Sequence, residues 1–119
     1  MQRRTLLLRA APLLALASTA AWPLAASAAA PMVEIWKDPN CGCCQDWVRH
    51  LEANGFATRV HDAGNSAART RLGIPAALGS CHTGLVGGYA LEGHVPAREV
   101  HRLLREKPKA VGLAVPGMP

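Results

Sequence analysis

The sequence predicts a small α/β domain in which short strands and helices alternate behind an N-terminal export signal. Segments with strand and helix patterns follow one another in the order β-α-β-α-β-β-α. Three of the four cysteines lie within the stretch Cys41-Gly42-Cys43-Cys44, at the first strand-to-helix junction. The roughly 90 residues after the signal support one hydrophobic core, so we expect a single domain.

The first 28 residues have the layout of a cleaved signal peptide. Arg3 and Arg4 give a basic start, the run from residue 10 to residue 24 is apolar, and Ala26-Ser27-Ala28 is a small-residue cleavage site. The paired arginines also fit a twin-arginine signal, so the general secretory and twin-arginine routes both stay open. We expect residues 1–28 to be removed and residues 29–119 to form a domain in the periplasm.

The charge of the mature chain argues against nucleic acid as a partner. Loss of Arg3, Arg4 and Arg9 with the signal lowers the formal charge from +5 to +2. No basic stripe interleaved with aromatic residues remains. The apolar run of the signal is too short for a stable membrane span, so we expect no membrane attachment after cleavage.

The first half of the domain is predicted as strand, helix, strand. Met32–Trp36 alternates weakly, as expected of a first strand. A helix begins at the cysteines, with Asn40 as its cap, and ends at Asn54-Gly55. The second strand runs over Phe56–His61.

The middle of the chain contains a short helix and a β-hairpin. The helix is predicted over Ser66–Leu72 and is closed by Gly73. Two strands, Cys81–Val86 and Tyr89–Leu91, are joined by Gly87-Gly88, a typical two-residue hairpin turn.

A last helix opens at Pro96, as a first-turn residue, and ends at Lys107-Pro108. The tail from residue 110 to residue 119 has no periodicity, and we predict no element there. The resulting order is that of a thioredoxin-like or glutaredoxin-like domain, which carries a Cys-x-x-Cys motif at the same junction.

The cysteine stretch indicates soft-metal or redox chemistry. Cys41 and Cys44 are three residues apart, so they share a face in a first helical turn. Helix N-terminal N–H groups and the helix dipole stabilise thiolates, which raises their reactivity. Soft thiolates select Cu(I), and one sulfur can bridge two copper ions, so a small site with more than one Cu(I) is chemically reasonable.

Other uses of the cysteines remain open. Zinc fits less well, because a structural zinc site usually takes two ligands from each of two segments. Here the first segment has three cysteines, and the second offers only Cys81 with His82 beside it. Four cysteines in an exported domain also allow purely structural disulfides, with Cys41–Cys44 as a thioredoxin-type bridge and Cys43–Cys81 as a staple.

Three further side chains are candidate metal ligands. His82 follows Cys81, but consecutive strand residues point to opposite faces, so a half-exposed hairpin histidine is an equally good interpretation. His94 lies in a loop that can bring it back to the cysteines. Met118 offers a soft thioether near the C-terminus.

Six blocks of sequence resemble the CopG-type family, small exported bacterial proteins linked to copper resistance. The resemblance covers essentially the whole mature chain. The matching blocks are Lys37-Asp38-Pro39-Asn40-Cys41-Gly42-Cys43-Cys44, Gly73-Ile74-Pro75, Ser80-Cys81-His82-Thr83, Gly87-Gly88-Tyr89, Glu92-Gly93-His94-Val95-Pro96 and Gly112-Leu113-Ala114-Val115-Pro116-Gly117-Met118. The resemblance implies a thioredoxin-like fold and copper binding by Cys41, Cys43, Cys44 and Cys81.

The sequence thus predicts a periplasmic copper-binding protein, rather than an enzyme, that holds Cu(I) in copper tolerance. Its partners would be copper ions and other periplasmic copper-handling proteins. The first alternative is a thiol–disulfide or copper oxidoreductase that uses Cys41 and Cys44 as its catalytic pair. The second alternative is an interaction module stapled by disulfides.

Overall fold

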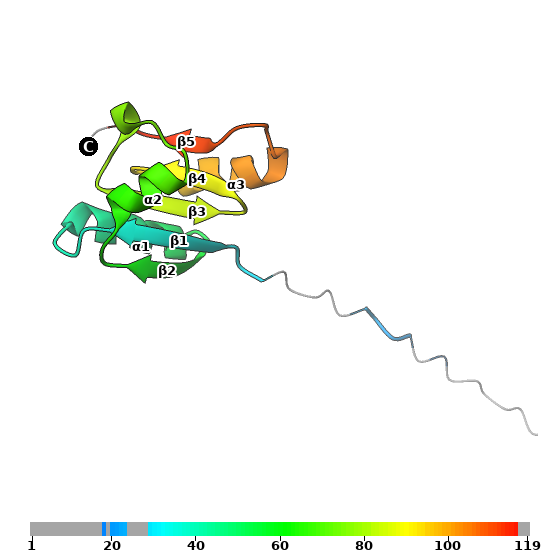
Figure 1. The fold of residues 1–119 in the computed structure, drawn as a ribbon. Coiled ribbons are helices and arrows are strands. Elements are labelled where there is room, and N and C mark those ends of the chain that lie inside the picture. Colours follow the sequence, from blue (N-terminus) through cyan, green and yellow to red (C-terminus); the bar gives the residue numbers. More distant parts are fainter. Residues whose placement is uncertain (1–17, 19, 24–28, 117–119) are drawn as a thin grey trace, which may run out of the picture.

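A five-stranded mixed β-sheet crosses the middle of the protein in the strand order β2-β1-β3-β4-β5 (Figure 1). This computed structural model describes residues 18, 20–23 and 29–116. Most of the predicted signal peptide (residues 1–28), and Met118 as well, lie outside the described residues.

The elements follow the predicted order and add one strand at the end. The strands are β1 (Met32–Lys37), β2 (Ala57–His61), β3 (His82–Val86), β4 (Tyr89–Glu92) and β5 (Gly112–Ala114); the helices are α1 (Gly42–Ala53), α2 (Asn65–Arg71) and α3 (Ala97–Glu106), with a 3₁₀ turn, η1 (Ala76–Leu78). β1 runs parallel to β2 and antiparallel to β3, β3 and β4 form the hairpin, and β5 runs parallel to β4. This is a thioredoxin-like fold, as predicted.

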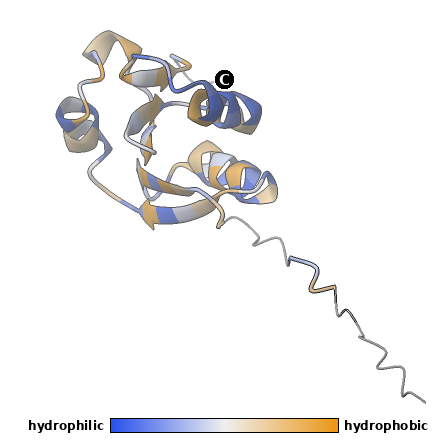
Figure 2. Ribbon diagram, turned by 90° about the vertical axis from the view of Figure 1, so that its right-hand side faces the viewer, coloured by the Kyte–Doolittle hydropathy of each residue, from blue (hydrophilic) through white to orange (hydrophobic). Residues whose placement is uncertain are grey.

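Helices cover both faces of the sheet. α1 and α3 lie on one face and α2 lies on the other, as the two perpendicular views show (Figures 1 and 2). Successive strand residues alternate between these faces. Val33 and Ile35 of β1 therefore join the core under α1 and α3 and are fully buried, whereas Trp36 lies beside Gly64 and Arg71 on the α2 side.

The glycine pair in the hairpin behaves as predicted. Gly87 and Gly88 have φ angles of +54° and +82°. A two-residue turn of the kind that matches the twist of a hairpin requires positive φ at both positions, which glycine adopts without steric cost.

The start of α1 differs from the prediction. Cys41, not Asn40, is the N-cap residue, and its Sγ accepts a hydrogen bond from the backbone N–H of Cys44 at 3.3 Å. Asn40 instead belongs to the preceding turn, where its N–H donates to Asp38 Oδ1 at 2.8 Å. The first cysteine of the motif thus ends the turn and begins the helix.

Two corrections concern the C-terminal third. Pro96 precedes α3 as its N-cap residue, and the N–H of Ala97 donates to His50 Nε2 at 3.0 Å. The tail, predicted to lack regular structure, contains β5. Its three residues pair with Ala90, Leu91 and Glu92 and are too few to give a periodic signal.

Among the residues that the structure describes, no helix has the length and apolar character needed to cross a membrane.

Gly112 gives a test of β5. A Cβ at this position would overlap the backbone of Ala90 in β4. We therefore expect Gly112→Ala to lower the free energy of unfolding, measured by urea denaturation, by roughly 1–3 kcal/mol. Gly42→Ala is the matched control, because it meets open space at the start of α1 and should raise stability by up to about 1 kcal/mol. Equal stability of Gly112→Ala and the wild type would contradict the close pairing of β4 and β5.

Candidate metal centre

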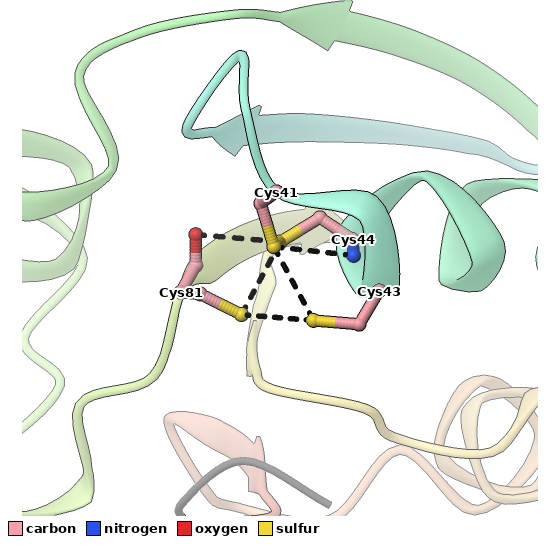
Figure 3. Close-up of side chains that lie close together, drawn as sticks. All are labelled: Cys41, Cys43, Cys44 and Cys81. Carbon is pink, nitrogen blue, oxygen red and sulfur yellow. Dashed lines mark hydrogen bonds between the residues drawn. A yellow bond between two sulfur atoms is a disulfide. The ribbon is translucent and has the colours of Figure 1, made fainter.

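All four cysteines meet at the N-terminus of α1. Cys41 caps the helix, Cys43 and Cys44 lie in its first turn, and Cys81 comes from the loop directly before β3 (Figure 3). Their four sulfur atoms lie within 4.8 Å of one another. The structure therefore brings together every cysteine that the sequence predicted as a ligand.

The pairing of β1 with β3 explains this meeting. Lys37, the last residue of β1, lies opposite His82, the first residue of β3. After Lys37 the chain turns into α1, and on the neighbouring strand Cys81 directly precedes His82. Strand register thus brings Cys81 close to Cys44 across 37 residues of sequence.

The cluster contains one disulfide and two thiols. Cys41 and Cys44 are disulfide-bonded, whereas Cys43 and Cys81 are not. Cys43 Sγ lies 3.3 Å from Cys41 Sγ and 3.8 Å from Cys81 Sγ, and Cys81 Sγ lies 3.2 Å from Cys44 Sγ. The thioredoxin-type bridge is therefore present, and the second pair is in contact without a bond.

Burial affects the cysteines unequally. Cys44 is fully buried, and the other three are half-buried. Burial raises the pKa of the Cys81 thiol, with a smaller opposing contribution from the hydrogen bond that the Ser80 hydroxyl donates at 3.9 Å. Proximity to Cys43 raises the same pKa further, because two neighbouring thiolates repel. A metal ion would relieve this repulsion.

His82 is fully buried, so the interpretation as a half-exposed hairpin residue is wrong. The alternation argument failed because Cys81 precedes the strand and is not bound by its alternation. The His82 ring stacks on Trp47 at a centroid distance of 4.3 Å. Its Nε2 lies 2.6 Å from the carbonyl oxygen of Gly93, and its Nδ1 lies 3.2 Å from Cys44 Sγ.

These contacts fix the state of the His82 ring. A carbonyl oxygen only accepts hydrogen bonds, so Nε2 carries the proton. Burial lowers the pKa of His82 to about 4; the bond to Gly93 raises it and the neighbouring His94 lowers it further. The ring is therefore neutral at neutral pH, with a lone pair on Nδ1 directed toward the sulfur atoms.

The His94 ring lies next to that of His82. It stacks on His82 at 5.1 Å between centroids. Its Nε2 is buried and has no hydrogen-bond partner among the described residues. A cavity of about 450 Å³ opens beside the cluster, lined by Cys43, Asp46, Trp47, His50, His94 and Pro96. This cavity gives solvent a path to Cys43.

Sequence reasoning missed two polar residues next to the cluster. Arg69 in α2 and the fully buried Glu92 at the end of β4 form an ion pair at 2.9 Å. Nothing in the spacing of these residues, 23 positions apart, marks them as partners. Only the fold reveals their contact with the loop that carries Cys81.

The donor set fits a soft metal ion. Thiolate sulfur selects Cu(I) and zinc over hard cations such as magnesium or calcium, and imidazole nitrogen is compatible with both. Within the described part of the chain, these four cysteines are the only group of three or more histidine, cysteine or acidic side chains placed to hold a metal ion.

Comparison with known proteins points in one direction. A family profile described as "Protein of unknown function, DUF411" matches residues 78–119. A solved structure titled "Copper resistance protein copG- Form 1" is 53% identical, with a TM-score of 0.69, and the match covers 74% of this chain and 70% of that one. A second, "Form 2", is 51% identical at the same TM-score, covering 75% and 72%. No curated protein sequence matches significantly.

The state of His82 can be measured in the metal-free protein. We expect an NMR titration of the ring nitrogens to show an Nε2-protonated neutral ring with a midpoint near pH 4. An unfolded histidine titrates near pH 6.5, so protons bind the unfolded chain more readily. The contribution of His82 to the free energy of unfolding should therefore fall as the pH drops from about 6.5 through about 4. A midpoint at or above 6.5 would contradict the buried, neutral assignment.

Proposed function

This chain belongs to the family of CopG-type copper-resistance proteins, and we propose that it binds Cu(I) through the thiolates of its four cysteines. The observation that carries the proposal is the convergence of four sulfur atoms within 4.8 Å. Four soft donors at one point, three of them from a single helical turn, match the preference of Cu(I) for thiolate. The proposed ligands are Cys41, Cys43, Cys44 and Cys81.

The distribution of the cysteines along the chain favours binding of copper over zinc, and of several copper ions over one. Structural zinc sites draw paired ligands from two separate segments, whereas here three of four sulfurs come from one segment. Sulfur can bridge two Cu(I) ions, so a compact group of thiolates can share several ions.

We propose His82 as an additional ligand. The hydrogen bond to Gly93 leaves the lone pair of Nδ1 facing Cys44 Sγ at 3.2 Å and Cys81 Sγ at 3.7 Å. Metal-binding histidines commonly donate their second ring N–H to a carbonyl or carboxylate in this way, which fixes ring orientation. A neutral ring also requires no proton release on binding.

Copper would enter through the cavity beside Cys43. Cys43 and His94 both line it, so it offers an incoming ion a sulfur and a nitrogen donor. The Nε2 of His94, buried and without a partner among the described residues, is a second candidate nitrogen ligand.

Full loading requires reduction of the cluster. Two of the four sulfurs are joined in the Cys41–Cys44 disulfide. A dithiol reductant would supply two electrons and two protons to this bond and become a disulfide itself. The freed thiols then lose their protons to the solvent as copper binds.

The same disulfide favours a second candidate function, thiol–disulfide or copper oxidoreduction by Cys41 and Cys44. Such an enzyme would need only these two cysteines, whereas all four sulfurs lie within 4.8 Å of one another, an arrangement better suited to a shared metal.

We place this function in the periplasm. The layout of residues 1–28 supports export and cleavage after Ala28, by the general secretory or twin-arginine route. There the domain formed by residues 29–119 would hold copper for tolerance and exchange it with other periplasmic copper-handling proteins.

Copper binding can be tested by titrating Cu(I) into the anaerobically reduced protein against a competing chelator, with native mass spectrometry to count ions. We expect more than one Cu(I) to bind. Cys43→Ser and Cys81→Ser should each weaken binding at least about tenfold, because each removes one thiolate. His101→Gln, which alters a histidine packed on Phe56 away from the cluster, should bind as the wild type does.

Two outcomes would contradict the proposal. The first is a reduced protein that fails to compete with the chelator, or that prefers zinc in a parallel titration. The second is a disulfide-exchange or copper-reducing activity that survives both Cys43→Ser and Cys81→Ser, which would favour the oxidoreductase. Protein that keeps the Cys41–Cys44 disulfide is the internal control, since it lacks two thiolates and should bind less copper.

A further inference from the structure

We propose that the ion pair of the half-buried Arg69 and the fully buried Glu92 positions Cys81 in the cluster. Cys81 is the one cysteine that lies outside α1 and its N-cap; it comes from the loop between η1 and β3. Its position therefore depends on whatever fixes that loop. Both charged residues act on Ser80, the residue directly before it.

Glu92 holds the loop from the sheet side. Its side chain, at the end of β4, is fully buried. One carboxylate oxygen accepts hydrogen bonds from Arg69 Nε at 2.9 Å and from the backbone N–H of Ser80 at 2.7 Å. The other accepts from the Thr83 hydroxyl at 2.6 Å. The carboxylate thus has three donors, as a buried charge requires.

Arg69 holds the same residue from the helix side. Its guanidinium group, on α2, donates to the backbone carbonyl of Ser80 as well as to Glu92. Both backbone polar groups of Ser80 are therefore bonded to the two members of one ion pair. The neighbouring Gly79 leaves room for this, since a Cβ there would lie 3.1 Å from the guanidinium carbon.

Gly93, the residue directly after β4, holds the other side of Cys81. Gly93 accepts the ring N–H of His82, and its own N–H donates to the His82 carbonyl at 3.3 Å. Glu92 and Gly93, adjacent in sequence, thus fix Ser80 and His82, the two neighbours of Cys81. The chain on both sides of Cys81 is therefore held by the last residue of β4 and the residue that follows it.

Stability alone does not explain this arrangement. Burying an ion pair costs desolvation energy, and apolar side chains of the same volume commonly stabilise a core as well or better. The ion pair fixes the geometry of the loop, because a planar guanidinium with several N–H donors bonds the carboxylate and the backbone carbonyl in one arrangement. That geometry sets the place of one sulfur relative to the three on α1.

Arg69→Lys is the sharpest variant, because it keeps the charge but cannot make the same set of hydrogen bonds. The copper readout rests on the proposed function: we expect Arg69→Lys to lower Cu(I) affinity by about 10- to 100-fold. Arg71→Lys is the matched control. It lies on the same helix, over the Trp36 ring and away from Ser80, and should leave affinity unchanged.

A double-mutant cycle separates positioning from general weakening of the fold. If Arg69 acts through Cys81, Arg69→Lys will cause no further loss of affinity in the Cys81→Ser background. A loss of the same size in both backgrounds would overturn the proposal. Glu92→Gln, which keeps the shape of the side chain, should repeat the result of Arg69→Lys.

A second readout needs no copper. In Cys43→Ser protein with the Cys41–Cys44 disulfide intact, Cys81 is the only thiol. Iodoacetamide should alkylate it several-fold faster when Arg69→Lys is added, and at an unchanged rate with Arg71→Lys. Equal rates would overturn the positioning role. A wild type that binds no copper would refute the proposed function and leave this readout intact.

Discussion

The centre depends on the antiparallel pairing of β1 with β3. This pairing places the end of β1 opposite the start of β3, with Lys37 facing His82. The chain passes from β1 into α1 at this edge of the sheet, and Cys81 directly precedes β3 at the same edge. The pairing therefore brings the start of α1 and Cys81 together. A shift of one residue in this register would turn His82 and its neighbours to the opposite face, because side chains in a strand alternate. The four sulfurs could then not meet.

Around this pairing, the protein combines a helix terminus that is rigid with a loop that needs support. Cys43 and Cys44 are fixed by the first turn of α1, and Cys41 is its N-cap residue. Cys81 depends on hydrogen bonds that its two sequence neighbours make. Ser80 is bonded to Arg69 of α2 and to Glu92 at the end of β4, and His82 is bonded to Gly93, directly after β4. Val115, directly after β5, extends this support, since its N–H donates to the carbonyl of Glu92. Elements distant in sequence thus converge on a single thiol.

Much of this could be predicted from sequence where the signal is local. The glycine pair at 87 and 88 fixed the hairpin, and the dense cysteine stretch located the candidate site. Signals that depend on tertiary contacts were not accessible. β5 is too short for a pattern, and its place follows from pairing with β4. The burial of His82 and the contact of Arg69 with Glu92 depend on register and on helix packing, which no spacing in one sequence reveals.

The central claim is that copper is held as Cu(I) by sulfur. Copper K-edge X-ray absorption of the anaerobically loaded protein tests it most directly. The account predicts the edge of Cu(I) and a nearest-neighbour shell dominated by sulfur, with at most a minor nitrogen contribution from His82. An edge of Cu(II) would contradict the assignment of Cu(I), and a shell of nitrogen and oxygen alone would show that the four cysteines do not hold the metal.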